Sequence, residues 1–282
     1  MSVYAQQITD DLRQWLRSQL DAGCRPDDIV AAMRTSGWSE PAALYALKEV
    51  QPGAQLPVDI QAPATRVPEP ALAEGVNLID VDGHPVRVLM TMKHPRVVLF
   101  GGLLTDEECD ALIEEARPRL ARSETVVNAT GGSEVNSART SDGMFFLRGE
   151  SPLIQRIENR IATLLNWPVK WGEGLQVLHY RPGAEYKPHH DYFDPAHSGT
   201  DAVLRRGGQR VGTLVMYLNT PARGGSTTFP DVALEVAAFK GNAVFFSYDK
   251  PQISTRTLHG GAPVVEGTKW VATKWLRERE FN

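Results

Sequence analysis

The sequence YKPHHDYF, residues 186–193, contains the pattern His-x-Asp at His189 and Asp191. Side chains two positions apart on a β-strand point to the same face of the sheet. An imidazole and a carboxylate can therefore reach one metal ion from a single short strand. Such pairs are common by chance, so this one indicates a metal site only if further ligands accompany it.

Two later residues extend the pattern. His259 lies in TLHGG, residues 257–261, and Lys269 lies in GTKW, residues 267–270. Two histidines and one carboxylate on one face of a metal, with open positions opposite, form the ligand set of non-heme Fe(II) oxygenases. A fixed ammonium group beside such a centre suits a dicarboxylate cosubstrate. Taken alone, His259 fits a polar residue at a strand end, and Lys269 fits a solvated surface lysine.

The other histidines near this pattern are not expected to bind the metal. His190 lies between two ligands and should point away from them because side chains alternate along a strand. His179 and His197 are lesser candidates. No cysteine cluster accompanies the histidines, which argues against structural zinc or an iron–sulfur cluster.

Four separate blocks resemble one known family. The run GLQVLHYRPGAEYKPHHDYFD, residues 174–194, closely resembles the prolyl 4-hydroxylase family of Fe(II)/2-oxoglutarate-dependent oxygenases, in its bacterial type. The blocks 210–213, 224–230 and 259–275 resemble the same family in the same order and spacing. The resemblance covers about residues 94–282 and leaves out the first 50 or so.

This resemblance implies an activity and its ligands. The positions that match the family's Fe(II) ligands are His189, Asp191 and His259. The positions that match its contacts to the cosubstrate 2-oxoglutarate are Tyr180, Thr213 and Lys269. The implied reaction hydroxylates peptidyl proline to 4-hydroxyproline and releases succinate and CO2, with ascorbate as the reductant. Apart from the resemblance, Tyr180 and Thr213 fit ordinary residues of a β-sandwich.

Two residues are candidates for substrate binding. Tyr186 matches a family position that contacts the substrate, and its alternative is an aromatic residue packed on Pro188. Arg206 belongs to a basic cluster near the site, and its alternative is a solvated loop. Two other functions stay open: the same iron chemistry on another residue or a small molecule, and a catalytically silent jelly roll that binds peptides.

Composition limits the classes of protein. The chain has 282 residues with 42% hydrophobic content, as in soluble globular proteins. Its net charge of −4 argues against general binding of nucleic acid. The absence of a long apolar run and of a secretory start predicts a cytoplasmic protein that does not enter the membrane. Cys24 and Cys109 are expected to stay reduced.

The chain is predicted to have three parts. Residues 1–50 should form a helical module, because apolar residues recur every fourth position in its first helix. This module resembles ubiquitin-associated three-helix modules, which implies a protein partner; a plain shield for one edge of the catalytic domain is the alternative. Residues 51–73 are rich in proline and should form an extended linker. Residues 74–282 should form the oxygenase domain.

Helices precede the strand-rich half of that domain. A hairpin is expected over residues 77–90, a strand over 96–100, and helices from Thr105, with a capping box, and from Ser151. The polar loop 128–141 is long for a plain connection and is interpreted as a lid over the substrate, with an ordinary surface loop as the alternative.

Short strands with glycine turns follow from residue 175 onward. The segments 233–239 and 243–248 are predicted to pair as one hairpin, and 263–265 and 270–276 as another. Many short strands indicate a β-sandwich or jelly roll, and the helices before them make the class α+β. The family resemblance further implies a double-stranded β-helix (jelly-roll) core backed by helices, beside the small N-terminal three-helix module.

Overall fold

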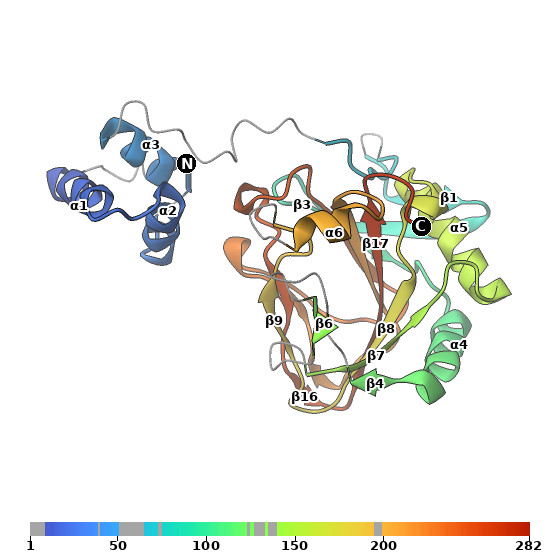
Figure 1. The fold of residues 1–282 in the computed structure, drawn as a ribbon. Coiled ribbons are helices and arrows are strands. Elements are labelled where there is room, and N and C mark those ends of the chain that lie inside the picture. Colours follow the sequence, from blue (N-terminus) through green and yellow to red (C-terminus); the bar gives the residue numbers. More distant parts are fainter. Residues whose placement is uncertain are drawn as a thin grey trace. The chain divides into compact units, whose positions relative to one another are not determined.

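The chain forms two units, Met1–Pro63 and Ala64–Asn282, and each is considered by itself (Figure 1). The structure is a computed structural model. The residues that it describes are 9–38, 40–50, 65–72, 75–122, 125–126, 133–134, 140–194 and 199–282. No helix among them is long and apolar enough to cross a membrane.

The first unit contains three helices. They are α1 (Asp10–Asp21), α2 (Pro26–Thr35) and α3 (Glu40–Val50). The hydroxyl of Thr9 caps α1 by accepting a hydrogen bond from the backbone N–H of Leu12. Leu16, Met33 and Leu47 meet in a small apolar core. The helices occupy the range predicted for the helical module, whose role stays a prediction.

The last part of the predicted linker packs on the oxygenase domain. Residues 65–72 belong to the second unit, in which the backbone N–H of Thr65 donates to the carbonyl of Asp249 at 2.8 Å. Pro68 and Pro70 are buried. Proline has no N–H to satisfy, so its ring packs on a neighbouring surface without stranding a donor. Residues 51–64 lie outside the described part.

A nine-stranded antiparallel sheet forms the second unit's centre. In spatial order its strands are β1 (Leu78–Val81), β2 (His84–Met92), β3 (Arg96–Gly101), β14 (Ala243–Ser247), β10 (Arg210–Tyr217), β17 (Lys269–Arg277), β8 (Leu175–Tyr180), β7 (Asp142–Phe146) and β4 (Ala121–Arg122). The hairpin predicted over residues 77–90 is present as β1 and β2, and it turns at Asp82 and Gly83, both with positive φ.

A four-stranded sheet faces the large one. It has the order β13 (Leu234–Val236), β12 (Thr227–Phe229), β15 (His259–Gly261) and β9 (Tyr186–His189). Phe229 from this sheet and Phe246 from the large sheet belong to one apolar core, with ring centroids 5.2 Å apart. Smaller pairs are β11 (Arg223–Gly224) with β16 (Val264–Glu266), and β5 (Thr125–Val126) with β6 (Ser133–Glu134).

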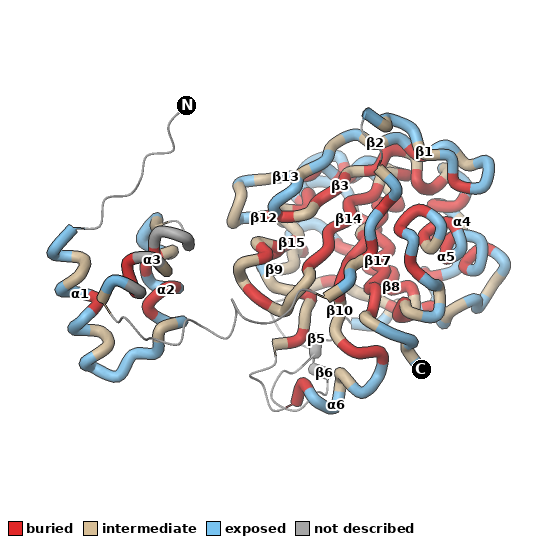
Figure 2. The backbone as a smooth tube through the Cα atoms, turned by 90° about the horizontal axis from the view of Figure 1, so that it is seen from above, coloured by how far each residue is buried: buried red, intermediate tan, exposed pale blue. Residues whose placement is uncertain are grey.

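Helices cover the other face of the large sheet. In Figure 2, α4 (Asp106–Ala116) and α5 (Pro152–Leu165) lie on one side of the buried central strands, and β9, β12 and β15 lie on the other. The predicted capping box of α4 is confirmed: Thr105 and Glu108 each accept a hydrogen bond from the other's backbone N–H. The expected mixture of helices and antiparallel strands is confirmed, with a short helix, α6 (Thr200–Leu204), after β9.

Both hairpins predicted in the second half are wrong. Strand β13 pairs with β12 in the small sheet, while β14 pairs with β3 and β10 in the large sheet. Strand β16 pairs with β11, while β17 pairs with β10 and β8. In both cases the chain crosses from one sheet to the other at a glycine, because the two strands supply opposite walls of the same core. The predicted lid over residues 128–141 lies mostly outside the described residues.

Glu108 offers a test of how α4 is held. Burial opposes its ionisation, but hydrogen bonds from Arg160, Thr105 and Arg156 prevail and lower its pKa from 4.5 to about 2. Glu108→Gln should reduce the free energy of unfolding at pH 7 by about 2 kcal/mol, because charge-assisted bonds to the buried Arg160 are lost. Urea unfolding followed by tryptophan fluorescence measures this.

The contribution of Glu108 to the stability of the fold should depend on pH in a defined direction. A carboxylate with a lowered pKa stabilises the fold fully above pH 4.5, and this contribution is lost as the pH falls towards 2. The stability difference between wild type and Glu108→Gln should therefore shrink over that window. The control is Glu114→Gln on the same helix, since Glu114 is exposed and its change should be within about 0.5 kcal/mol. Equal losses in both variants would contradict the assignment.

Candidate active site

The pairing of β9 with β15 brings the two predicted histidines together. His189 ends β9, His259 begins β15, and the two are direct partners across the antiparallel pair. Their ring centroids lie 4.4 Å apart. Asp191 lies in a bend beyond the end of β9, so the expectation that it shares a strand with His189 is wrong. The bend still turns its carboxylate towards both imidazoles.

The three side chains form one donor set. Asp191 Oδ1 lies 3.5 Å from His189 Nε2, and Oδ2 lies 3.5 Å from His259 Nε2. Ligand atoms of all three residues lie within 4.8 Å of one another. Each Nδ1 lies 2.9 Å from a backbone carbonyl, that of Lys187 or Thr257. A carbonyl only accepts, so Nδ1 carries the proton and Nε2 presents its lone pair to the shared centre.

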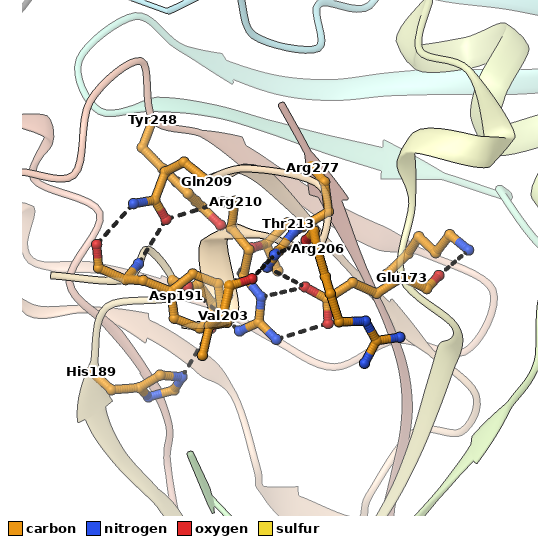
Figure 3. A network of polar contacts seen from close by, with 12 residues as sticks. Glu173, His189, Asp191, Val203, Arg206, Gln209, Arg210, Thr213, Tyr248 and Arg277 are labelled. Carbon is orange, nitrogen blue, oxygen red and sulfur yellow. Dashed lines mark hydrogen bonds and ion pairs between the residues drawn. The ribbon is translucent and has the colours of Figure 1, made fainter. Parts of the chain in front are cut away.

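The electrostatics of this centre suit a divalent cation. Burial opposes ionisation of Asp191, but the imidazoles and Arg210 prevail and hold its pKa well below the usual range. Burial lowers the pKa of His259 to about 4. Thr213 donates its hydroxyl to Asp191 Oδ2 at 2.7 Å (Figure 3). One carboxylate and two imidazoles, with one side facing a cavity, fit the Fe(II) ligand set.

That cavity lies between the two sheets. It holds about 460 Å³ of empty space, including its open mouth. Besides the three donors, the predicted site residues that line it are Tyr180, Tyr186, Thr213 and Lys269. Leu178, Val271 and Trp275 make part of its wall apolar. The cavity therefore joins a metal-binding end to a cationic end through a partly apolar space.

Lys269 supplies the cation. Only 3% of its surface is exposed, and burial alone lowers its pKa to about 8. No carboxylate of the described residues contributes to its pKa, and its ammonium nitrogen lies 5.4 Å from the centre of the Tyr180 ring. A Cβ at Gly261 would lie 3.8 Å from that nitrogen, so the glycine leaves room beside it. An unpaired buried ammonium is costly unless a ligand supplies the anion.

Three predicted residues have partners that refine their interpretation. Tyr186 stacks on His189 with ring centroids 3.7 Å apart, which fixes the imidazole plane. Thr213 contacts Asp191 and Tyr248, so its observed bonds lie on the metal side of the cavity. Arg206 does not line the cavity. Its guanidinium donates to the carbonyl of Asn282 at 2.7 Å, so its substrate role stays a prediction without geometric support.

Comparison with known proteins places the chain in a family. Residues 175–277 match the model of the 2OG-Fe(II) oxygenase superfamily. Prolyl 4-hydroxylase 5 of Arabidopsis thaliana is 39% identical over 209 residues, which are 67% of this chain and 70% of the relative. This chain belongs to the prolyl 4-hydroxylase family. Membership confirms the predicted enzyme class, a 2-oxoglutarate-dependent dioxygenase, and its two ligands, Fe(II) and 2-oxoglutarate.

Other members of the prolyl 4-hydroxylase family agree. Prolyl 4-hydroxylase 1 of Arabidopsis thaliana is 41% identical over 203 residues, 66% of this chain and 70% of the relative. The viral collagen prolyl hydroxylase of Paramecium Bursaria Chlorella virus-1, solved as its 2OG complex, is 30% identical with a TM-score of 0.51. That match covers 64% of this chain and 95% of the viral one.

Sequence reasoning missed part of this prolyl 4-hydroxylase site. The guanidinium of Arg210 donates to both carboxylate oxygens of Glu173, at 2.7 and 2.9 Å, and lies 4.0 Å from the centre of the Trp275 ring. Arg277 also donates to Glu173, at 3.2 Å (Figure 3). Glu173 directly precedes the block that carries the family resemblance, and this position was its only signal. The network supports the cavity wall at Trp275.

The other described histidines near this pattern contact aromatic rings. His179 stacks on Trp270 with centroids 4.2 Å apart, and His190 stacks on Tyr192 at 4.7 Å. Neither lines the cavity. His197 lies outside the described residues.

Asp191→Asn tests the metal centre directly. The amide keeps the shape of the side chain but removes the negative charge, so affinity for Mn²⁺, an oxygen-stable substitute for Fe(II), should fall at least ~100-fold. Isothermal titration calorimetry measures it, and circular dichroism verifies the fold. Asp201→Asn, at an exposed position on α6, is the control and should bind like wild type. Unchanged Mn²⁺ affinity in Asp191→Asn would remove this residue from the ligand set.

Lys269→Met tests the cationic end. The loss of its charge should raise the KM for 2-oxoglutarate by ~30-fold or more, about 2 kcal/mol, with metal affinity unchanged. In the wild type the KM should rise above pH 8, because the ammonium form of a lysine with a pKa of about 8 disappears there. The variant should lose this pH dependence. The exposed Lys93→Met is the control, and a wild-type KM in Lys269→Met would refute the role.

Proposed function

We propose that this protein is an Fe(II)- and 2-oxoglutarate-dependent dioxygenase that hydroxylates peptidyl proline to 4-hydroxyproline, with release of succinate and CO2. One observation carries the proposal. The donor atoms of His189, Asp191 and His259 face the same cavity as the unpaired ammonium of Lys269. A small dicarboxylate that binds the metal at one end and an ammonium at the other matches this arrangement.

Each side chain then has a role. His189, Asp191 and His259 hold the iron, which with 2-oxoglutarate and dioxygen supplies the oxidising power for hydroxylation of an unactivated C–H bond. Lys269 binds the distal carboxylate of 2-oxoglutarate, and the hydroxyls of Tyr180 and Thr213 lie on the same cavity wall. The apolar side chains of the wall exclude water and strengthen these charge pairs.

The substrate assignment rests on the mouth of the cavity and on the relatives. Tyr186 lies half-buried on His189 and presents its ring towards the metal end. A flat aromatic face suits the uncharged ring of proline. The similar plant proteins are named prolyl 4-hydroxylases, and the similar viral protein is named a collagen prolyl hydroxylase. A peptide with proline is accordingly the substrate that we propose.

The proposal also covers the core of the domain, the reductant, the N-terminal module and the location of the enzyme. The two facing sheets support a double-stranded β-helix as the core of residues 74–282, and ascorbate is the reductant that keeps the iron ferrous. The three helices of residues 1–50 form a module that binds a protein partner. The enzyme is cytoplasmic and of bacterial type, and its composition does not favour nucleic acid or membrane as partners.

Succinate formation tests the reaction, and mass spectrometry tests the target. With Fe(II), 2-oxoglutarate and a proline-rich peptide, the wild type should release succinate and add one oxygen to proline, whereas the same peptide with alanine for proline should stay unmodified. Asp191→Asn should be inactive with both. Iron-dependent succinate release with oxygen added to another residue would contradict the assignment of proline as the target. The absence of succinate with every peptide would favour a catalytically silent protein that binds peptides.

A further inference from the structure

Where β10 ends beside Lys269, the side-chain amide of Asn219 makes the hydrogen bonds that a backbone peptide group would otherwise make. The last backbone bond of this stretch runs from the N–H of Leu218 to the carbonyl of Trp270, at 2.9 Å. Beyond it, Asn219 Nδ2 donates to the carbonyl of Thr268 at 2.7 Å, and Asn219 Oδ1 accepts from the N–H of Trp270 at 2.6 Å. The two peptide groups that flank Lys269 are thus both held by one carboxamide.

The sequence explains why a side chain takes this position. Pro221 follows two residues later and has no N–H with which the ladder could continue. A carboxamide offers the same donor and acceptor as a peptide group, so Asn219 extends the pairing by one step. Lys269 itself has no anionic partner among the described residues, and its position therefore depends on its backbone and on the packing of its stem.

The other end of β10 has a matching carboxamide. Gln209 Oε1 accepts from the backbone N–H of Phe193 at 2.7 Å, and Gln209 Nε2 donates to the carbonyl of Phe193 at 2.8 Å. Phe193 lies just beyond Asp191 in the bend that follows β9. Glu278 in turn holds the backbone of Gln209: its carboxylate accepts from the N–H of Gln209 at 3.0 Å, and its own N–H donates to the carbonyl of Gln209 at 2.9 Å.

Strand β10 between these carboxamides is a rigid spacer. It pairs with β14 on one side and β17 on the other. Its Thr213 also contacts the carboxylate of Asp191. The segment with the metal-binding carboxylate and the segment with the cation are therefore both fastened to one buried strand, at its opposite ends.

We propose that Asn219 and Gln209 are positioning residues that set the separation between the metal and the ammonium group of Lys269 to the length of 2-oxoglutarate. Asn219 acts on the cosubstrate through Lys269, and Gln209 acts on the metal through Asp191. This inference rests on the proposed function. It adds that each carboxamide affects the affinity for one ligand: Asn219 the affinity for 2-oxoglutarate, and Gln209 the affinity for the metal.

The test compares two ligands that share one end. Both 2-oxoglutarate and oxalate chelate a metal, but oxalate has no distal carboxylate that could reach Lys269. Calorimetry on Mn²⁺-loaded Asn219→Ala should show 2-oxoglutarate binding weakened roughly five- to tenfold, as expected for one or two net hydrogen bonds. Oxalate and Mn²⁺ affinities should stay within about twofold. In Gln209→Ala the Mn²⁺ affinity should fall by a similar factor.

A double variant shows whether Asn219 acts through the lysine. Adding Asn219→Ala to Lys269→Ala should cause no further loss of 2-oxoglutarate affinity, because the group that Asn219 positions is absent. Equal losses for oxalate and 2-oxoglutarate in Asn219→Ala, or additive losses in the double variant, would overturn the proposal for Asn219. Unchanged Mn²⁺ affinity in Gln209→Ala would overturn it for Gln209.

Two controls keep these outcomes interpretable. If an alanine variant fails to fold, Asn219→Ser is measured instead, since serine keeps a polar group but cannot bridge both peptide groups; it should show the same selective loss for 2-oxoglutarate. The wild type separates this inference from the proposed function. Wild-type protein that binds no 2-oxoglutarate refutes the function, whereas a normal wild type with normal variants refutes the positioning roles alone.

Discussion

The antiparallel pairing of β9 with β15 is the interaction on which the site depends. It places His189 directly opposite His259, although the two lie far apart in the sequence. Backbone carbonyls on each segment fix the imidazole tautomers, so the strands determine which nitrogen faces the centre. The carboxylate of Asp191 then enters from the bend after β9. A shift of one residue in this register would turn one imidazole to the opposite face.

The second constraint is that the metal-binding imidazoles and the buried cation lie on different sheets. The small sheet carries the imidazoles, whereas the large sheet carries Lys269 and the apolar wall around it. An ammonium group buried without an anion is costly in the free protein, so its cost is relieved only when an anionic ligand enters. The same burial makes that pairing strong and specific. Rigid strands keep the two ends at a fixed separation.

The sequence was enough to predict a helix cap and the candidate metal ligands. It was not enough to predict where the chain passes from one sheet to the other. The capping box at Thr105 follows from neighbouring residues, and His189 and His259 were found because metal ligands are few in kind. The glycine turn at Gly241 looked like a hairpin because a turn does not tell which sheet receives the next strand. Gln209 gave no signal and Glu173 only its place before the family block, since acids and amides are common in all sequences and only the fold shows which groups they contact.

Pulsed electron paramagnetic resonance of the Mn²⁺-loaded protein tests the central claim most directly, because it counts the nitrogen nuclei bound to the ion. The account predicts one Mn²⁺ per chain with couplings to two imidazole nitrogens. One coupling should disappear in His189→Ala and one in His259→Ala, and both should persist in His190→Ala. A wild-type spectrum with one imidazole nitrogen or none would contradict the claim that β9 and β15 together build the metal centre.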